Sequence, residues 1–141
     1  MKVLLLFTGG TISMVRDPKT GALHPADMTT FQSFVPELFA GDIQVDMVPF
    51  DPLLDSSDLN PDNWRQMATV VKENYDKYDG FVILHGTDTM AYSASALSFM
   101  FDNLCKPVVF TGRRKARGTD NRTHVKHRIA EAGGQTHIGF G

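Results

Sequence analysis

The chain has little of what several protein classes require. It contains a single cysteine, Cys105, so an internal disulfide framework is excluded, and no cysteine spacing indicates a metal site. No apolar run approaches the roughly 18–20 residues that a membrane helix needs. The apolar run at 2–7 is followed directly by Thr8-Gly9-Gly10, too early for a signal peptide. We therefore expect a cytoplasmic protein with no membrane partner.

The size and composition are those of an ordinary globular domain. Of the 141 residues, 42% are hydrophobic and 21% are charged. A second domain of normal size does not fit, so the chain is one domain or a fragment of a larger one. A chain of this length can bury a core without disulfides or a metal.

Charge is distributed unevenly along the chain. Residues 1–112 carry seven Lys or Arg against fourteen Asp or Glu, a net charge of −7. Residues 113–141 carry seven Lys or Arg against two acidic residues, a net charge of +5. We therefore divide the chain near Gly112 into a domain, 1–112, and a basic tail, 113–141.

Strand and helix patterns alternate through the first part. Short apolar or alternating runs predict strands at 2–7, 42–50, 81–84 and 107–110. Longer segments predict a short helix from Asp27 through Phe31, Phe34 and Leu38, and further helices at 61–79 and 90–103. Alternation of this kind predicts an α/β fold. Its form would be a three-layer αβα sandwich around a mainly parallel sheet, Rossmann-like or flavodoxin-like.

The helix that starts at Pro61 has the clearest signals. Asn60 stands at its cap and Pro61 at its first position. Apolar side chains then recur at spacings of three and four, which predicts one buried face: Trp64, Met67, Ala68, Val71, Tyr75 and Tyr78.

Polar residues follow several of the predicted strands. In parallel sheets, ligands bind beyond the carboxyl ends of the strands. We therefore expect three segments at that edge: Thr8–Thr11, Asp55–Ser57 and His85–Asp88. The intervening stretch Thr8–Asp27 is expected to be a long loop, which in compact domains is usually a functional lid or disordered.

The first of these segments, Thr8-Gly9-Gly10-Thr11, offers a close backbone approach and a hydroxyl. Its glycines let a ligand reach main-chain amides, and Thr11 can face the same space. The alternative is that the glycines only make a tight turn and Thr11 caps it. The segment is not a nucleotide fingerprint, since both Gly-x-Gly-x-x-Gly and Gly-Lys-Ser/Thr are absent.

The other two segments also have a functional and a purely structural interpretation. Asp88 can hold an ammonium group or orient a base, and Thr87 is a second candidate nucleophile. Alternatively, Asp88 or Thr89 only caps the next helix. The segment Asp55-Ser56-Ser57-Asp58 is either a polar clamp or a solvated connection. His85 has no second ligand at a usable spacing, so we expect no metal site.

Together these segments resemble the bacterial-type L-asparaginases. The stretch Thr8–Met14 is similar to the first signature of that family, and Val82–Phe99 is similar to the second. Asp55–Asp58 resembles the substrate-clamp loop of the cytoplasmic, type I branch. The resemblance covers residues 1–112, so the fold would be a truncated N-terminal asparaginase domain.

The resemblance implies hydrolysis of L-asparagine to L-aspartate and ammonia, without a cofactor or metal. Thr11 would be the nucleophile, and Thr87 and Asp88 would act with a lysine from further along the chain. Asp88 would also bind the substrate's α-ammonium group, while Asp55, Ser56 and Ser57 would hold its α-carboxylate end. Backbone donors near Thr11 and near Thr87 are both candidates for the oxyanion hole. Family members form homo-oligomers.

Nothing after Gly112 continues the resemblance. We interpret residues 113–141 as the product of a shifted reading frame near codon 112, which would leave an incomplete, inactive fragment. A genuine basic tail that binds a polyanion is the alternative. Nucleic-acid binding is not favoured, because the tail has one aromatic residue, Phe140. A non-catalytic amino-acid-binding relic is the third possibility.

Overall fold

The computed structural model describes residues 1–9, 14–16, 19–21, 23–25, 29, 36 and 42–112. The predicted helix through Phe31, Phe34 and Leu38 and the basic tail 113–141 lie outside these residues.

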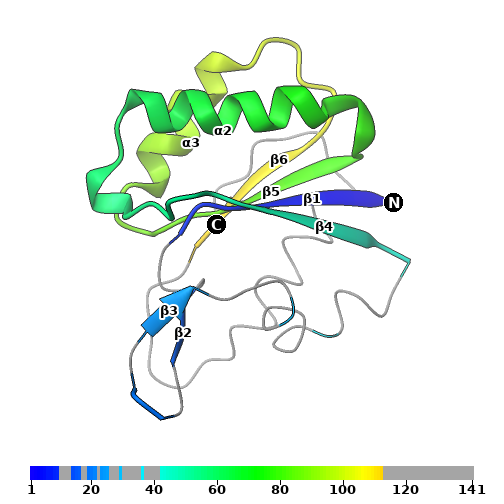
Figure 1. Cartoon of the computed structure of the whole chain (residues 1–141). Helices are drawn as coiled ribbons and strands as arrows, with labels where there is room; N and C mark the ends of the chain where they lie inside the picture. Colours follow the sequence, from blue (N-terminus) through cyan, green and yellow to red (C-terminus); the bar gives the residue numbers. More distant parts are fainter. Residues whose placement is uncertain are drawn as a thin grey trace.

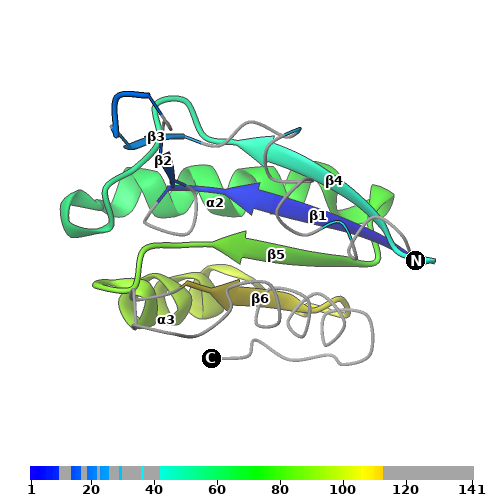
Figure 2. The same ribbon diagram turned by 90° about the horizontal axis from the view of Figure 1, so that it is seen from below.

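A parallel sheet of four strands forms the centre of the domain. Its strands are β1 (Lys2–Phe7), β4 (Gln44–Pro49), β5 (Gly80–Leu84) and β6 (Val108–Thr111). They lie in the order β4-β1-β5-β6, and each neighbouring pair is parallel (Figure 2). The α/β class and all four predicted strands are therefore confirmed.

The segment that we expected to be a long loop contains a small hairpin. Strands β2 (Met14–Arg16) and β3 (Leu23–Pro25) pair antiparallel. The hairpin lies on the side of the main sheet away from the helices (Figure 1). The prediction missed it because a period-two pattern needs about four residues to be visible, and each strand has three.

Both described helices cover one face of the sheet (Figure 1). Helix α2 (Pro61–Asn74) continues into a 3₁₀ turn at Tyr75–Lys77, and α3 is Met90–Met100. Met67, Val71, Ala94 and Leu97 from the helices share one buried cluster with strand residues of this face. Neither of these helices is long and apolar enough to cross a membrane.

Helix α3 ends three residues earlier than we predicted. Phe101 is already extended, with φ −104° and ψ 120°. Asn103 has a left-handed backbone, with φ 56°. Asp102 and Asn103 are residue types that favour turns, and this local preference ends the helix before the predicted position.

The opposite face of the sheet is also buried. Its cluster consists of Val3, Leu5, Phe7, Val45, Val82, Leu84 and Val109. Strands β1 and β5 are thus apolar on both faces, as their continuous hydrophobic runs predict for inner parallel strands. The described helices cover the other face only, so the second helical layer of the predicted three-layer sandwich stays a prediction.

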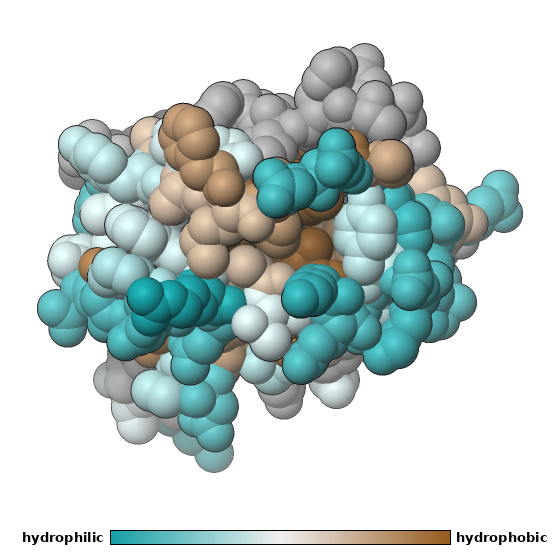
Figure 3. Space-filling view, turned by 90° about the horizontal axis from the view of Figure 1, so that it is seen from above, coloured by the Kyte–Doolittle hydropathy of each residue, from teal (hydrophilic) through white to brown (hydrophobic). Residues whose placement is uncertain are grey.

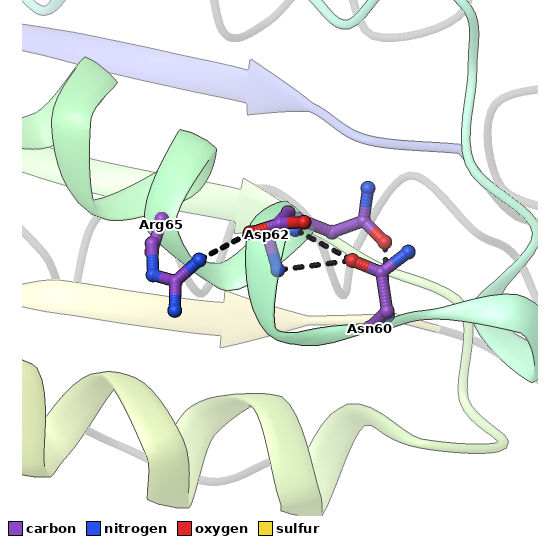
Figure 4. Close-up of polar contacts among 4 residues, drawn as sticks. Asn60, Asp62 and Arg65 are labelled. Atoms are coloured by element: carbon purple, nitrogen blue, oxygen red, sulfur yellow. Dashed lines mark hydrogen bonds and ion pairs between the residues drawn. The ribbon is translucent and has the colours of Figure 1, made fainter.

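The start of α2 is fixed by a reciprocal cap (Figure 4). The Asn60 side chain accepts hydrogen bonds from the backbone N–H of Asp62 at 2.9 Å and of Asn63 at 3.3 Å. The Asn63 side chain in turn accepts from the Asn60 N–H at 2.9 Å. Arg65 pairs with Asp62 one turn along. The predicted cap and the position of Pro61 are both confirmed.

Removing this cap is expected to destabilise the domain measurably. Asn60→Ala leaves N–H groups of the first turn without a partner, which costs about 1 kcal/mol of unfolding free energy. Asn60→Asp keeps an acceptor oxygen and is the matched control. Urea unfolding followed by circular dichroism compares the two. Equal stability of the Ala and Asp variants would show that the cap contributes nothing.

Candidate active site

The strand order creates a switch point at the carboxyl edge of the sheet. From β1 the chain continues to β4 on one side, whereas from β5 it continues to β6 on the other. The last residues of the two diverging strands, Phe7 and Leu84, lie side by side in register. In open parallel sheets this is where ligands bind, because the diverging connections leave a crevice between them.

Thr8 fastens the end of β1 to the end of β5. Its backbone N–H and its hydroxyl both donate to the Leu84 carbonyl, at 3.1 and 2.7 Å. Only 2% of the residue is exposed. The Thr8 hydroxyl is therefore committed to the fold.

The loop after β4 is seated directly against this junction. The Leu54 N–H donates to the Thr8 carbonyl at 2.7 Å. Gly9 has φ +135°, and a Cβ placed on it would lie 2.1 Å from the Leu54 carbonyl oxygen. Gly9 therefore has a backbone angle, and a close approach to Leu54, that residues with a Cβ do not tolerate. Gly10 and Thr11, the predicted nucleophile, lie outside the described residues.

Ser56 connects this loop to the segment that follows β5. It is 7% exposed, and a Cβ on Gly86 would lie 2.2 Å from its hydroxyl oxygen. The Thr89 hydroxyl donates to the Ser56 carbonyl at 2.6 Å. The structure thus brings together two of the three segments that were predicted to meet, 55–57 and 85–88, and Thr89 directly after the second adds to the contact.

Asp55 and Ser57 interact with each other at the surface. The Asp55 carboxylate accepts from the backbone N–H of Ser57 at 2.9 Å and from its hydroxyl at 2.8 Å. These two bonds lower the pKa of Asp55, so the group is ionised at neutral pH. The carboxylate caps the 3₁₀ turn Ser56–Asp58. For Asp55 and Ser57 the interpretation as a solvated connection is thus consistent with the contacts, whereas Ser56 is buried.

Thr87 and Asp88 lie at the open side of the same edge. Thr87 is half-buried, and Asp88 is exposed, so its carboxylate is accessible. Thr89 occupies the cap position of α3, but its side chain makes no capping bond and points to Ser56 instead. Thr89 is therefore the N-cap residue by position, as one interpretation predicted, but its side chain does not cap the helix, because its hydroxyl bonds to the loop after β4 instead.

His85 is buried beneath these residues, with 1% of its surface exposed. The backbone N–H of His85 donates to the Thr111 carbonyl at 2.9 Å. The ring atom Nδ1 lies 2.6 Å from the Gly86 carbonyl oxygen. That contact assigns the proton to Nδ1, and Nε2 has no partner in the described part of the chain. Burial lowers the pKa of His85. A neutral imidazole therefore supports the turn.

Sequence reasoning missed the parts played by Leu54 and Thr89. Leu54 acts through its main chain, which leaves no trace in a side-chain pattern. In the sequence, these contacts are indicated by Gly9 and Gly86, because a glycine often stands where another chain segment comes close.

Comparison with protein families gives a match over most of the chain. The family model described as "Asparaginase, N-terminal" matches residues 2–121. The chain is 45% identical over 111 residues to L-asparaginase 1 of Escherichia coli, an alignment that covers 78% of this chain and 33% of that protein. The chain thus spans about a third of the length of this relative.

Two solved structures are similar in fold. L-asparaginase I from Vibrio cholerae has a TM-score of 0.75 and 41% identity, covering 90% of this chain and 39% of that one. The thermostable L-asparaginase from Thermococcus kodakarensis has a TM-score of 0.81 and 33% identity. That match covers 94% of this chain and 40% of the Thermococcus chain.

A methyl group on Gly86 should disturb the meeting of the two loops. In Gly86→Ala the new Cβ would lie 2.2 Å from the Ser56 hydroxyl oxygen and 2.5 Å from its Cβ. We expect a loss of about 1–3 kcal/mol in unfolding free energy, as for other overpacked sites. Ser56→Gly removes both atoms and should restore most of this loss, whereas Ser56→Ala should not. Failure of Ser56→Gly to rescue would contradict the close contact.

Acid should weaken the fold through His85. Its folded pKa lies below the ordinary value of 6.5, so as the pH falls below about 6.5 the unfolded chain takes up the proton first. The stability that depends on a neutral imidazole is fully present above that pH and declines below it. Unfolding free energies from urea titrations at pH 7.5 and 5.5 measure the decline.

His85→Asn is the matched control for this pH dependence. Its amide N–H replaces the Nδ1 donor and does not titrate. The wild-type chain should lose more stability between the two pH values than the variant does, by up to about 1.4 kcal/mol per pH unit. Equal losses would exclude the buried imidazole as the cause.

Proposed function

Because the chain belongs to the asparaginase family, we propose that the carboxyl edge of its sheet is an asparaginase-type amidohydrolase site. Its substrate would be L-asparagine, and the products would be L-aspartate and ammonia. The contact of Ser56 with Gly86 and Thr89 supports this proposal most strongly. It assembles the proposed clamp loop and the proposed catalytic segment at one switch point, where a parallel sheet binds ligands.

In this proposal, Thr11 attacks the side-chain amide carbon of asparagine. A threonine hydroxyl is a weak nucleophile until a base removes its proton. Thr87 and Asp88 would take part in that proton transfer together with a lysine. The oxyanion that forms needs donors placed in advance, and backbone N–H groups near Thr11 and near Thr87 are the candidates.

Substrate recognition follows from the charges at the edge. The accessible carboxylate of Asp88 suits the α-ammonium group of the substrate. The α-carboxylate would be held by hydroxyl and backbone donors of the 55–57 loop. The Asp55 carboxylate is ionised and occupied by Ser57, so its role would be to shape the loop, since a direct contact would be repulsive.

The proposed reaction also needs a lysine, which by resemblance comes from further along the chain. This chain matches about a third of the length of the E. coli relative. Lys115 and Lys126 could in principle replace that lysine, but nothing in the sequence places either of them near Thr87. We therefore propose that the 141-residue chain binds its amino-acid ligand but releases ammonia slowly, if at all.

Binding and turnover can be measured separately on the full chain. We expect L-aspartate and L-asparagine to perturb the amide resonances of residues 55–57 and 85–89 in NMR titrations. Asp88→Ala should weaken this binding at least tenfold, because it removes the partner of the ammonium group. Ammonia release from L-asparagine should be slow, and Thr11→Ala should abolish whatever release is seen.

The two interpretations of the site give different results. Ammonia release that depends on Thr11 identifies an active amidohydrolase, whereas binding without turnover identifies an amino-acid-binding module. Asp58→Ala, in the same loop but outside the proposed site, is the control and should bind normally. Absence of binding by the wild-type chain, or equal binding by Asp88→Ala, would refute the proposed site.

A further inference from the structure

A histidine that the proposed reaction does not use lies beneath the candidate site. The ring of His85 is on the helical face of the sheet, where it packs against Phe110 with the ring centroids 5.8 Å apart. Figure 3 shows the outer surface of the helical layer that covers this face. Only 1% of His85 is exposed, so the ring is closed to ligands. Any part that it plays at the site is therefore indirect.

Histidine is a costly residue at this position. Its ring atom Nε2 is buried and has no hydrogen-bond partner in the described part of the chain. A buried polar atom without a partner is unfavourable, and an apolar side chain of similar size would fill the position without that cost. His85 therefore contributes something that an apolar side chain does not. Among the described residues, its one side-chain hydrogen bond is that of Nδ1 with the Gly86 carbonyl oxygen at 2.6 Å.

This hydrogen bond acts on the peptide group that leads into the proposed catalytic segment. The Gly86 carbonyl belongs to the same planar unit as the Thr87 N–H, and in a trans peptide the two point in opposite directions. With the carbonyl held toward the buried ring, the Thr87 N–H is directed away from it. Gly86 has no Cβ to limit the rotation of this peptide group, so the imidazole fixes its orientation.

The segment 85–89 is anchored at both ends. At one end the His85 ring holds the backbone, and at the other the Thr89 hydroxyl donates to the loop after β4 at 2.6 Å. Between these anchors, the N–H groups and side chains of Thr87 and Asp88 have no hydrogen-bond partner in the part of the chain that the structure describes. The direction in which these two residues face thus depends on the anchors.

We propose that His85 is a positioning residue of the ligand site: its hydrogen bond from Nδ1–H to the Gly86 carbonyl sets the following peptide group so that Thr87 is presented to the bound amino acid. This role rests on the proposed function, since it requires that the carboxyl edge binds an amino acid. His85 itself touches neither the ligand nor the reacting atoms. Its contribution is preorganisation, because the groups of the segment need not reorient when the ligand binds.

The position of the proton on the imidazole is a direct test that needs no ligand. Nδ1 must carry the proton, because only then does it donate to the Gly86 carbonyl. The chemical shifts of the two ring nitrogens of His85, measured by NMR on the isotope-labelled full chain at neutral pH, distinguish the two tautomers. We expect protonation on Nδ1. A ring protonated on Nε2 would overturn the proposal, whatever the chain binds.

Two substitutions of similar shape separate the hydrogen bond from the packing. Leucine and asparagine have nearly the same outline, but only asparagine places an N–H where Nδ1 stands. We expect His85→Leu to weaken the binding of L-aspartate about tenfold, as the loss of one hydrogen bond would. His85→Asn should restore the affinity to within about threefold of the wild-type value. Calorimetric titration of the full chain with L-aspartate measures both.

Tyr78→Phe is the matched control for a general loss of stability. It also removes one hydrogen bond, from the Tyr78 hydroxyl to Asp46 at 2.9 Å, but at the other end of β5. This variant should be less stable and bind L-aspartate normally.

The outcomes distinguish the positioning role from the proposed function. Equal affinity of the wild-type chain and His85→Leu, or equal losses in the Leu and Asn variants, would overturn the positioning role and leave the proposed site intact. If the wild-type chain does not bind L-aspartate, the proposed function fails and this role fails with it. Protonation on Nδ1 would then be a feature of the fold alone.

Discussion

The arrangement of the candidate site depends on one constraint, the contact of the loop after β4 with the ends of two other strands. Leu54 meets Gly9, and Ser56 meets Gly86, at separations that leave no room for a Cβ. The hydrogen bonds from Leu54 to Thr8 and from Thr89 to Ser56 hold the same contacts. The loop after β4 thereby links the carboxyl ends of β1 and β5, the two strands from which the chain continues to opposite sides of the sheet. Of the proposed site residues, Ser56, Thr87 and Asp88 lie in the two segments that meet at this junction.

Much of the fold follows from local signals. The continuous apolar runs of β1 and β5 specify strands buried on both faces, and Asn60 with Pro61 specifies the start of α2. The hairpin β2–β3 and the end of α3 were not predicted, because three-residue strands and a turn at Asp102 and Asn103 give only weak patterns. Hydrophobic periodicity thus identifies the long elements, and it is uninformative where an element is shorter than its own repeat.

The meeting of two of the three polar segments was predictable from the sequence, but the contacts between them were not. Polar residues at strand ends placed 55–57 and 85–89 at one edge of the sheet. The contacts showed that Thr89 braces the neighbouring loop and that Asp55 caps a turn. Each of these side chains has more than one possible hydrogen-bond partner nearby. Which partner it takes depends on the folded structure and cannot be read from a single sequence. Of the residues singled out, Ser56 is buried in the junction and Asp88 is open to solvent.

The central position of β1 has a consequence for how the protein is made. This strand is synthesised before both of its neighbours, since it pairs with β4 on one side and with β5 on the other, joining Val3 to Val45 and to Gly80. Its apolar side chains therefore emerge from the ribosome long before either neighbour exists, and the sheet cannot close until β5 has followed. Strand pairing over such separations is slow and leaves hydrophobic segments exposed in the meantime. Residues 2–7 are thus a segment of the nascent chain that a chaperone would have reason to hold.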